Sequence, residues 1–236
     1  MFHPTPETPR AGEGGKTPVK LVVGLGNPGA EYKHSPHNMG FAVVDRLAER
    51  LGVGLDRKRA KSRYGKMQCG GEDVFLIQPQ TYMNLSGLSI KEWLDKEGCR
   101  PGDLVVIHDE LDLPWDTIQI RQRGSSAGHH GVESIIETLG LKEFVRVRIG
   151  VAPDHPLEDP AGYLLRPVRG SQRKAVDEIV ERAAQATEMI LREGVAKAMS
   201  RFNQREGRRH EPAPQKVSRN SPGANSVRKE SGHKLL

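Results

Sequence analysis

Short apolar runs alternate with amphipathic stretches along most of the chain. The apolar runs include residues 20–25 (KLVVGL), 74–79 (VFLIQP) and 103–109 (DLVVIHD), and the amphipathic stretches include 41–52, 88–98 and 131–140. The runs are shorter than typical helices, whereas the stretches between them repeat apolar residues at helical spacing. Such an alternation of strands and helices is typical of the α/β class.

Two kinds of strand are expected. Residues 21–25 and 104–109 are rich in β-branched apolar side chains, which favours central, parallel strands that are buried on both faces. Residues 117–123 (TIQIRQR) and 144–152 (FVRVRIGVA) alternate apolar with polar side chains, which predicts strands with one solvated face. A last segment, 173–201, predicts one long helix, because its apolar residues form a stripe at helical spacing.

Composition divides the chain into three parts. Residues 1–17 are rich in Pro, Gly, Thr and Glu, and residues 203–236 in Arg, Ser, Asn, Pro and Gly, so neither end can bury enough apolar surface to fold alone. We expect a disordered N-terminal extension over 1–17, a single α/β domain over 18–202 and a disordered basic tail over 203–236.

Most of the net charge of +6 lies in that tail. Residues 203–236 carry eight basic and three acidic side chains, a net charge of +5, so residues 1–202 are nearly neutral. Any site for a polyanion on the folded part must therefore be a local patch. The chain has no uncharged apolar window of about 20 residues and no signal-peptide pattern in its first 19 residues, so we expect an intracellular protein without a membrane span.

A glycine-rich turn follows the first strand. Residues 24–29 (GLGNPG) match the pattern GxGxxG, and Asp45 lies where a dinucleotide site places a ribose-binding acid. However, Pro28 and Pro36 prevent a helix from starting inside the turn, and Asp45 falls in a stretch with helical periodicity. A tight turn is the favoured interpretation, and a dinucleotide-dependent oxidoreductase stays an alternative that a nucleotide affinity column would test.

Polar side chains gather where the predicted strands end. Alone, each of them could be a helix cap or a turn residue. Together they bring several imidazoles, amides and one carboxylate to the edge of the sheet where ligands bind in α/β proteins, which favours a functional site. These residues are Asn27, Asn84, His108, Asp109, His129 and His130, with His37 and Asn38 at the start of the first helix.

Water is the expected nucleophile at such a site. The sequence has no GxSxG motif and no cysteine beside a plausible base, whereas a neutral imidazole oriented by a carboxylate can take a proton from water. A metal site is disfavoured, because the chain has no HExxH motif, its two cysteines are too few for a structural zinc site, and the adjacent His108 and Asp109 should point to opposite faces of a strand.

Five separated motifs, in order, make the chain resemble bacterial-type peptidyl-tRNA hydrolases. They are VVGLGNPGAEYKHSPHNMGF, QPQTYMNLSG, VIHDELDLP, GSSAGHHGVESI and FVRVRIGV, spread over about residues 20–201. The resemblance implies a single α/β domain with a mixed, mainly parallel sheet flanked by helices. It also implies a cytoplasmic, usually monomeric enzyme that hydrolyses the ester between peptide and tRNA, recycles tRNA from aborted translation and uses no metal or organic cofactor.

The resemblance also assigns catalytic roles within residues 18–202. The general base of the family falls on His37 and its orienting carboxylate on Asp109, in agreement with the chemistry expected from the residues alone. Asn27 matches the residue that helps to place the water and the scissile group. Asn84 matches the residue that grips the main chain of the peptide.

Further residues match substrate-binding positions of the family. Tyr32 falls near the expected tRNA end, and His129 matches a histidine of the glycine-rich loop. His130 stands where the family commonly has Asn, so substrate contacts there are open. Arg121 and Arg148 fall on two basic positions that hold the phosphate at the tRNA end.

Two questions stay open. A non-catalytic RNA-binding relative with the same fold is the alternative function, although retention of His37 and Asp109 together with both amides favours the enzyme. The basic cluster within residues 57–66 follows the tRNA backbone or forms a solvated loop. Its members are Arg57, Lys58, Arg59, Lys61, Arg63 and Lys66.

Overall fold

The most apolar runs form the centre of the sheet. The computed structural model describes residues 17–203, and these lie in one compact unit. Strand β1 (Val19–Gly24) pairs in parallel with β4 (Glu72–Pro79) on one side and with β5 (Leu104–Pro114) on the other, and β5 pairs in parallel with β7 (Val145–Ala152). The central, parallel placement predicted for residues 21–25 and 104–109 is confirmed.

Antiparallel strands complete the sheet at both edges. The order is β2-β3-β4-β1-β5-β7-β6, where β2 is Arg57–Arg59, β3 is Ser62–Cys69 and β6 is Ile118–Arg121. The basic cluster therefore lies on a β-hairpin, and its interpretation as a loop is wrong. Arg59 lies 3.7 Å from the centre of the Trp93 ring and is half-buried, so part of this cluster stabilises the fold.

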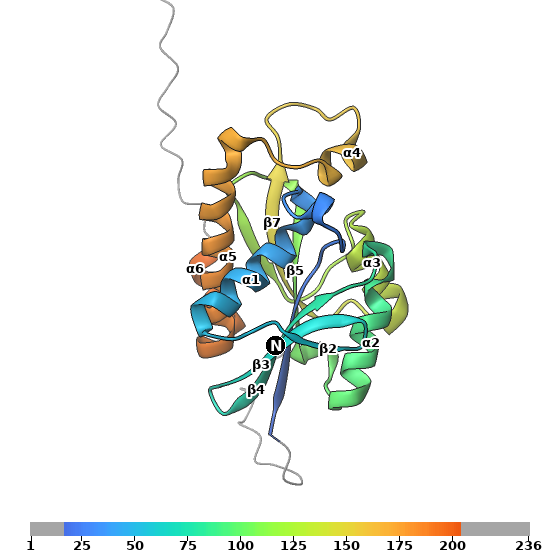
Figure 1. The fold of residues 1–236 in the computed structure, drawn as a ribbon. Coiled ribbons are helices and arrows are strands. Elements are labelled where there is room, and N and C mark those ends of the chain that lie inside the picture. The colour runs from blue at the N-terminus through green and yellow to red at the C-terminus, as the bar shows by residue number, and fades with distance from the viewer. Residues whose placement is uncertain (1–16, 204–236) are drawn as a thin grey trace, which may run out of the picture. The chain divides into compact units, whose positions relative to one another are not determined.

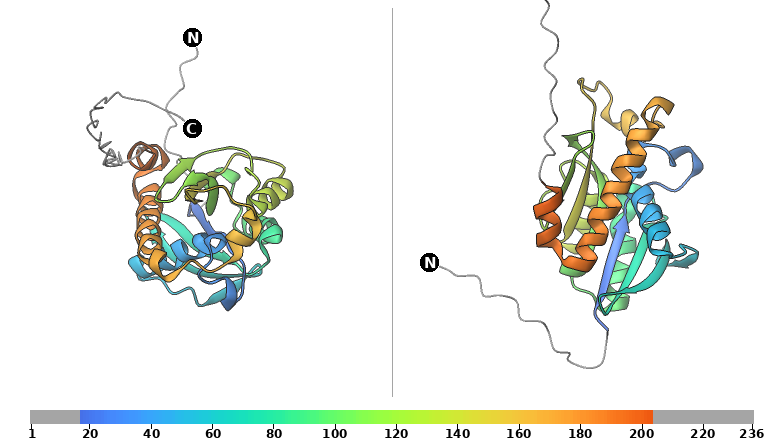
Figure 2. Two further views of the ribbon diagram at one scale, coloured as in Figure 1. Left: turned by 90° about the horizontal axis from the view of Figure 1, so that it is seen from above. Right: turned by 90° about the vertical axis from the view of Figure 1, so that its left-hand side faces the viewer.

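Helices cover both faces of the sheet (Figure 1). On one face lie α1 (Met39–Leu51), α5 (Arg173–Glu193) and α6 (Val195–Phe202), which Figure 2 shows along the sheet in its right-hand view. On the other face lie α2 (Ser86–Glu97) and α3 (His130–Leu139).

Alternate side chains of each central strand enter different halves of the core. Val22 packs in the half under α1 and α5, whereas Leu21 and Val23 pack with Ile90 and Trp93 of α2. This alternation follows from the two-residue period of a strand. It explains why the central runs are apolar at every position.

Glycines end three of the helices. Gly52, Gly98 and Gly140 follow α1, α2 and α3 with φ of 66°, 66° and 69°, a left-handed conformation that glycine adopts without a steric cost. Gly194, with φ 90° and ψ 161°, interrupts the last helical segment. The prediction of one helix over 173–201 is therefore wrong, because that segment consists of α5 and α6.

Strand β7 differs from its prediction as well. Both of its faces are buried, and Arg146 is only 3% exposed. Its arginines have partners inside the protein: Arg146 donates to the carbonyl oxygens of Ser125 and Lys142, and Arg148 pairs with Glu110. Alternation of arginine with valine thus reflects buried hydrogen bonds rather than a solvated face.

The predictions for the chain ends mostly concern residues outside the described range. Only Thr17 and Asn203 of the expected extension and tail are described. Within residues 17–203 no helix is long and apolar enough to cross a membrane. A short helix that the apolar pattern did not predict, α4 (Pro160–Leu165), lies near the ends of the central strands.

Candidate active site

Close packing between a helix and two strands brings the first site residues together. His37 lies in a 3-10 turn, Pro36–Asn38, directly before α1. Gly40 in the first turn of α1 packs so tightly that a Cβ there would overlap the backbone of Leu25 and the carbonyl oxygen of Ile107. This contact places His37 beside Asp109, which lies within β5.

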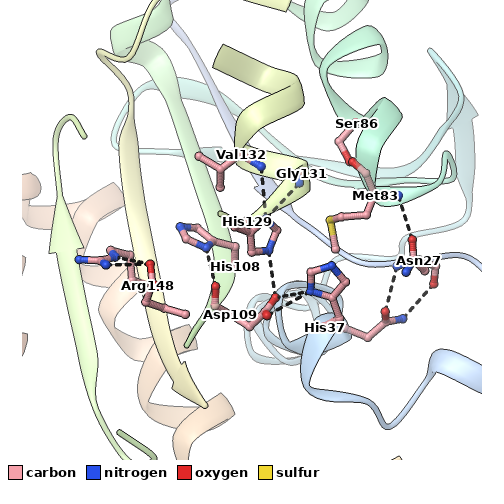
Figure 3. A network of polar contacts seen from close by, with 12 residues as sticks. Asn27, His37, Met83, Ser86, His108, Asp109, His129, Gly131, Val132 and Arg148 are labelled. Carbon is pink, nitrogen blue, oxygen red and sulfur yellow. Dashed lines mark hydrogen bonds and ion pairs between the residues drawn. The ribbon is translucent and has the colours of Figure 1, made fainter. Parts of the chain in front are cut away.

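Asp109 accepts hydrogen bonds from two imidazoles (Figure 3). Nδ1 of His37 lies 3.0 and 3.1 Å from its two carboxylate oxygens, and Nε2 of His129 lies 3.0 Å from Oδ1. All three side chains are buried. Burial raises the pKa of a carboxyl group, but His129 and His37 outweigh burial and hold the pKa of Asp109 below its ordinary range.

The two imidazoles differ at their other nitrogen. His129 is the N-cap of α3, and its Nδ1 accepts from the backbone N–H groups of Gly131 (3.1 Å) and Val132 (3.3 Å). Its proton is therefore on Nε2, and both of its nitrogens are occupied. His37 uses only Nδ1 toward Asp109 and lines the neighbouring pocket, so its Nε2 is the nitrogen that can accept a proton there.

Hydrogen bonds also fix the amide of Asn27. Its side-chain oxygen accepts from the backbone N–H of Met83 (2.8 Å), and its backbone is paired in both directions with the side chain of Asn38 (2.9 Å each). With Oδ1 occupied, the Nδ2 donor of Asn27 is left for the pocket. Asn84 lies next to Met83 in the 3-10 turn Met83–Leu85 and is exposed at the same pocket.

One pocket of about 580 Å³ unites most of the predicted residues. It is lined by His37, Asp109, Asn27, Asn84, His129 and His130. Tyr82 and, from α4, Leu164 and Leu165 also line this pocket, and the sequence pattern did not predict this apolar part of the lining. The pair Asp159-Pro160 could have predicted the start of α4, because an N-cap residue followed by proline is typical of a helix start. The Asp159 side chain accepts from the N–H of Gly162 at 2.8 Å.

Known proteins with similar sequences identify the family. The family model for peptidyl-tRNA hydrolase matches residues 21–210. The chain is 47% identical over 190 residues to a peptidyl-tRNA hydrolase of Koribacter versatilis, covering 79% of this chain and 94% of that protein. It is 49% identical over 185 residues to one of Solibacter usitatus, covering 78% and 94%. The chain belongs to the peptidyl-tRNA hydrolase family.

A solved structure of the peptidyl-tRNA hydrolase family has the same fold. The crystal structure of the enzyme from Acinetobacter baumannii superimposes with a TM-score of 0.73 at 31% sequence identity, covering 78% of this chain and 94% of that one. The predicted α/β fold, with a mixed sheet whose central strands are parallel, is confirmed.

The residues matched to tRNA-binding positions of the family lie outside this pocket. Tyr32 is half-buried and does not line it. Arg121 and Arg148 line a second cleft of about 420 Å³, which we call the arginine cleft because Arg123 and Arg146 border it too. Arg121 is exposed there, whereas Arg148 lies 2.7 Å from the carboxylate of the buried Glu110.

Peptidyl-tRNA hydrolases were expected to work without a metal, yet the site contains a possible ligand set. The ligand atoms of His37, Asp109 and His129 lie within 4.8 Å of one another. Both rings, however, already donate to the carboxylate, and Nδ1 of His129 is held by backbone N–H groups. An ion bound by all three residues would have to displace a hydrogen bond of His129, because both nitrogens of that ring are already in use.

The glycine-rich turn has a packing role in this member of the family. A Cβ on Gly24 would overlap the backbone of Gly40, and one on Gly26 would lie 2.7 Å from the Phe41 ring. Two 3-10 turns follow, not the helix that a pyrophosphate requires. A larger hollow of about 720 Å³ lies beyond this turn, but it contains neither His37 nor Asp109, so chemistry rather than size identifies the site.

Proposed function

We propose that this protein hydrolyses the ester between peptide and tRNA in peptidyl-tRNA, with His37 as the general base. The observation that carries this proposal is the difference between the two imidazoles on Asp109. His129 has no nitrogen left to take a proton from the pocket, whereas His37 has Nε2. An intact base and orienting carboxylate do not favour the alternative of a non-catalytic RNA-binding protein.

In the proposed reaction, Nε2 of His37 takes a proton from a water molecule as its oxygen attacks the ester carbonyl carbon. Asp109 stabilises the resulting imidazolium through Nδ1, and the Nδ2 donor of Asn27 faces the oxygen on which negative charge develops. The bond from the carbonyl carbon to the ribose oxygen then breaks, and that oxygen recovers the proton from His37. Peptide acid and tRNA are the products.

The two cavities suit the two halves of such a substrate. Asn84, His130 and the apolar side chains of α4 border the pocket, which favours the peptide there. Arg121 in the arginine cleft offers a guanidinium group without an ion pair among the described residues, and we propose that it holds a terminal phosphate of the tRNA together with Arg148. We also propose that Tyr32 lies near the tRNA end. The enzyme acts as a monomer in the cytoplasm, where its substrate is made.

The test is release of a labelled N-acyl amino acid from N-acyl-aminoacyl-tRNA. We expect His37→Ala to lower kcat by roughly two to four powers of ten, because positioned general-base catalysis contributes about that much. Binding of tRNA should persist. His34→Ala is the matched control, since His34 is exposed three residues away and does not line the pocket. Retention of more than about a tenth of wild-type turnover in His37→Ala would show that another group is the base.

A further inference from the structure

His108 is a buried imidazole to which the proposed reaction gives no role. It precedes Asp109 on β5 and is 2% exposed. Its Nδ1 lies 2.7 Å from the backbone carbonyl oxygen of Asp109, so Nδ1 carries the proton and donates. The ring also packs edge-on against His129, with 4.8 Å between ring centres. His108 thus contacts both the backbone of the orienting carboxylate and the ring that holds its Oδ1.

The other nitrogen of this ring has no partner. Nε2 of His108 is buried and makes no hydrogen bond to any residue of the described part of the chain. A buried acceptor without a donor destabilises the folded state, so packing alone does not account for an imidazole at this position. Apolar side chains of similar size would fill the same space without that cost.

The surroundings keep the ring neutral. Burial first, and then the neighbouring His129, lower the pKa of His108 well below its ordinary value. A neutral ring with its proton on Nδ1 donates to Asp109 and leaves Nε2 as an acceptor. The charged and titratable groups around it come from its own strand, from the loop before α3 and from the strands beside the arginine cleft: Asp109, Glu110, His129, Arg121, Arg123, Arg146 and Arg148.

We propose that His108 is a positioning residue that acts through Asp109. Its Nδ1–H holds the Asp109 backbone, and its ring supports His129, so the carboxylate stays aligned with Nδ1 of His37. His108 borders the arginine cleft and not the pocket, and Figure 3 shows its ring on the side of Asp109 away from His37. His108 therefore acts on His37 and Asp109 only through the Asp109 backbone and the His129 ring, and it contacts no reacting atom. This inference rests on the proposed function of His37.

Three substitutions test the inference. In His108→Asn the amide nitrogen stands close to the position of Nδ1 and can still donate to Asp109, whereas in His108→Gln it stands close to Nε2 and cannot. His108→Leu removes the donor. We expect kcat for N-acyl-aminoacyl-tRNA to fall by about ten- to a hundredfold in the Leu and Gln variants, since small misplacements of catalytic groups have effects of that size. KM should change by less than about threefold, and the Asn variant should stay within about threefold of wild type.

Stability measurements separate positioning from a structural role. Because His108→Leu removes an unpaired buried acceptor, its melting temperature at pH 7.5 should not fall below that of His108→Asn. The inference is overturned if the Leu and Gln variants keep wild-type kcat, if Asn is as impaired as Gln, or if lost activity only follows lost folded protein. If His108→Leu does not fold, the comparison of Asn with Gln still decides. Failure of the proposed function would look different, because His37→Ala would then match wild type.

Discussion

The three imidazoles around Asp109 differ in what their second nitrogen meets. That of His129 meets backbone N–H groups, that of His37 meets the pocket, and that of His108 meets nothing in the described chain. The three histidines therefore differ in whether a ring nitrogen is free to accept a proton from the pocket. Only the ring with a nitrogen open to the pocket can act as a base, while the other two hold the carboxylate in place.

The buried ring of His108 also makes the free energy of unfolding depend on pH. Its pKa is lower in the folded than in the unfolded chain, so the unfolded chain binds more protons between the two values and stability falls as pH drops below about 6.5. One such group changes the free energy of unfolding by at most about 1.4 kcal/mol per pH unit. The carboxylate of Asp109, whose pKa is also lowered, adds its own loss only below its ordinary value of 3.8.

Urea unfolding at pH 7.5, 6.0 and 5.0 checks this prediction. Wild type should lose stability across this range more steeply than His108→Leu, because the variant has no ring to protonate on unfolding. Asp109 contributes equally to both proteins above pH 5 and does not confuse the comparison. Equal slopes would mean that His108 is not held neutral in the folded protein.

At the scale of elements, the contact of α1 with the central strands decides where His37 lies. Alanine normally stabilises a helix relative to glycine. At Gly40, however, a Cβ would overlap the backbone of Leu25 and of Ile107, and backbone atoms cannot yield as a flexible side chain does. We therefore expect Gly40→Ala to lower the free energy of unfolding by about 1–3 kcal/mol, as overpacking does. It should also lower kcat, because His37 lies just before this helix.

Gly102 provides the control for Gly40. No atom lies within 4 Å of a Cβ at Gly102, and its backbone is not in the left-handed region. Gly102→Ala should change stability by no more than about 0.5–1 kcal/mol and leave kcat unchanged. If urea unfolding gives the same midpoint for both variants, close packing of α1 is not what fixes the site.

For the molecule as a whole, we expect the basic segment after Asn203 to contribute to binding of tRNA. Asn203, which follows α6, pairs through its side chain with the backbone N–H and carbonyl of Ile120 in β6 at 2.7 and 3.0 Å, next in sequence to Arg121 of the arginine cleft. Lysine and arginine side chains gain affinity for nucleic acid by releasing counterions from phosphates. Deletion of residues 204–236 should therefore weaken binding of whole tRNA and leave turnover of a small ester unchanged.

The salt dependence distinguishes this role from a solubilising one. In filter binding or fluorescence titration, the slope of log affinity against log salt concentration should become shallower by about one or more for the truncated protein. Asn203 is retained in that variant because it is bonded to β6. Identical slopes for the full-length and truncated proteins would show that the segment does not contact the tRNA.

The class of the fold and the candidate chemistry followed from the order of residues along the chain. Uninterrupted apolar runs must be buried on both faces, which made residues 21–25 and 104–109 central strands. Local patterns were less reliable where a single residue ends a helix or where a partner distant in the sequence buries a polar side chain. Gly194 broke a periodic stripe into two helices, and Arg146 found buried partners that alternation along β7 could not reveal.

The contacts of each ring nitrogen became visible only in the folded chain. The resemblance matches His37 to the base, but the sequence does not show what each ring nitrogen of His37, His108 and His129 contacts. The start of α3 at His129 and the pocket at His37 make that difference. The arginines matched to tRNA binding likewise proved to border a separate cleft. The physical reason is that a ring's protonation and role depend on the donors and acceptors within about 3 Å, and these come from segments distant in the chain.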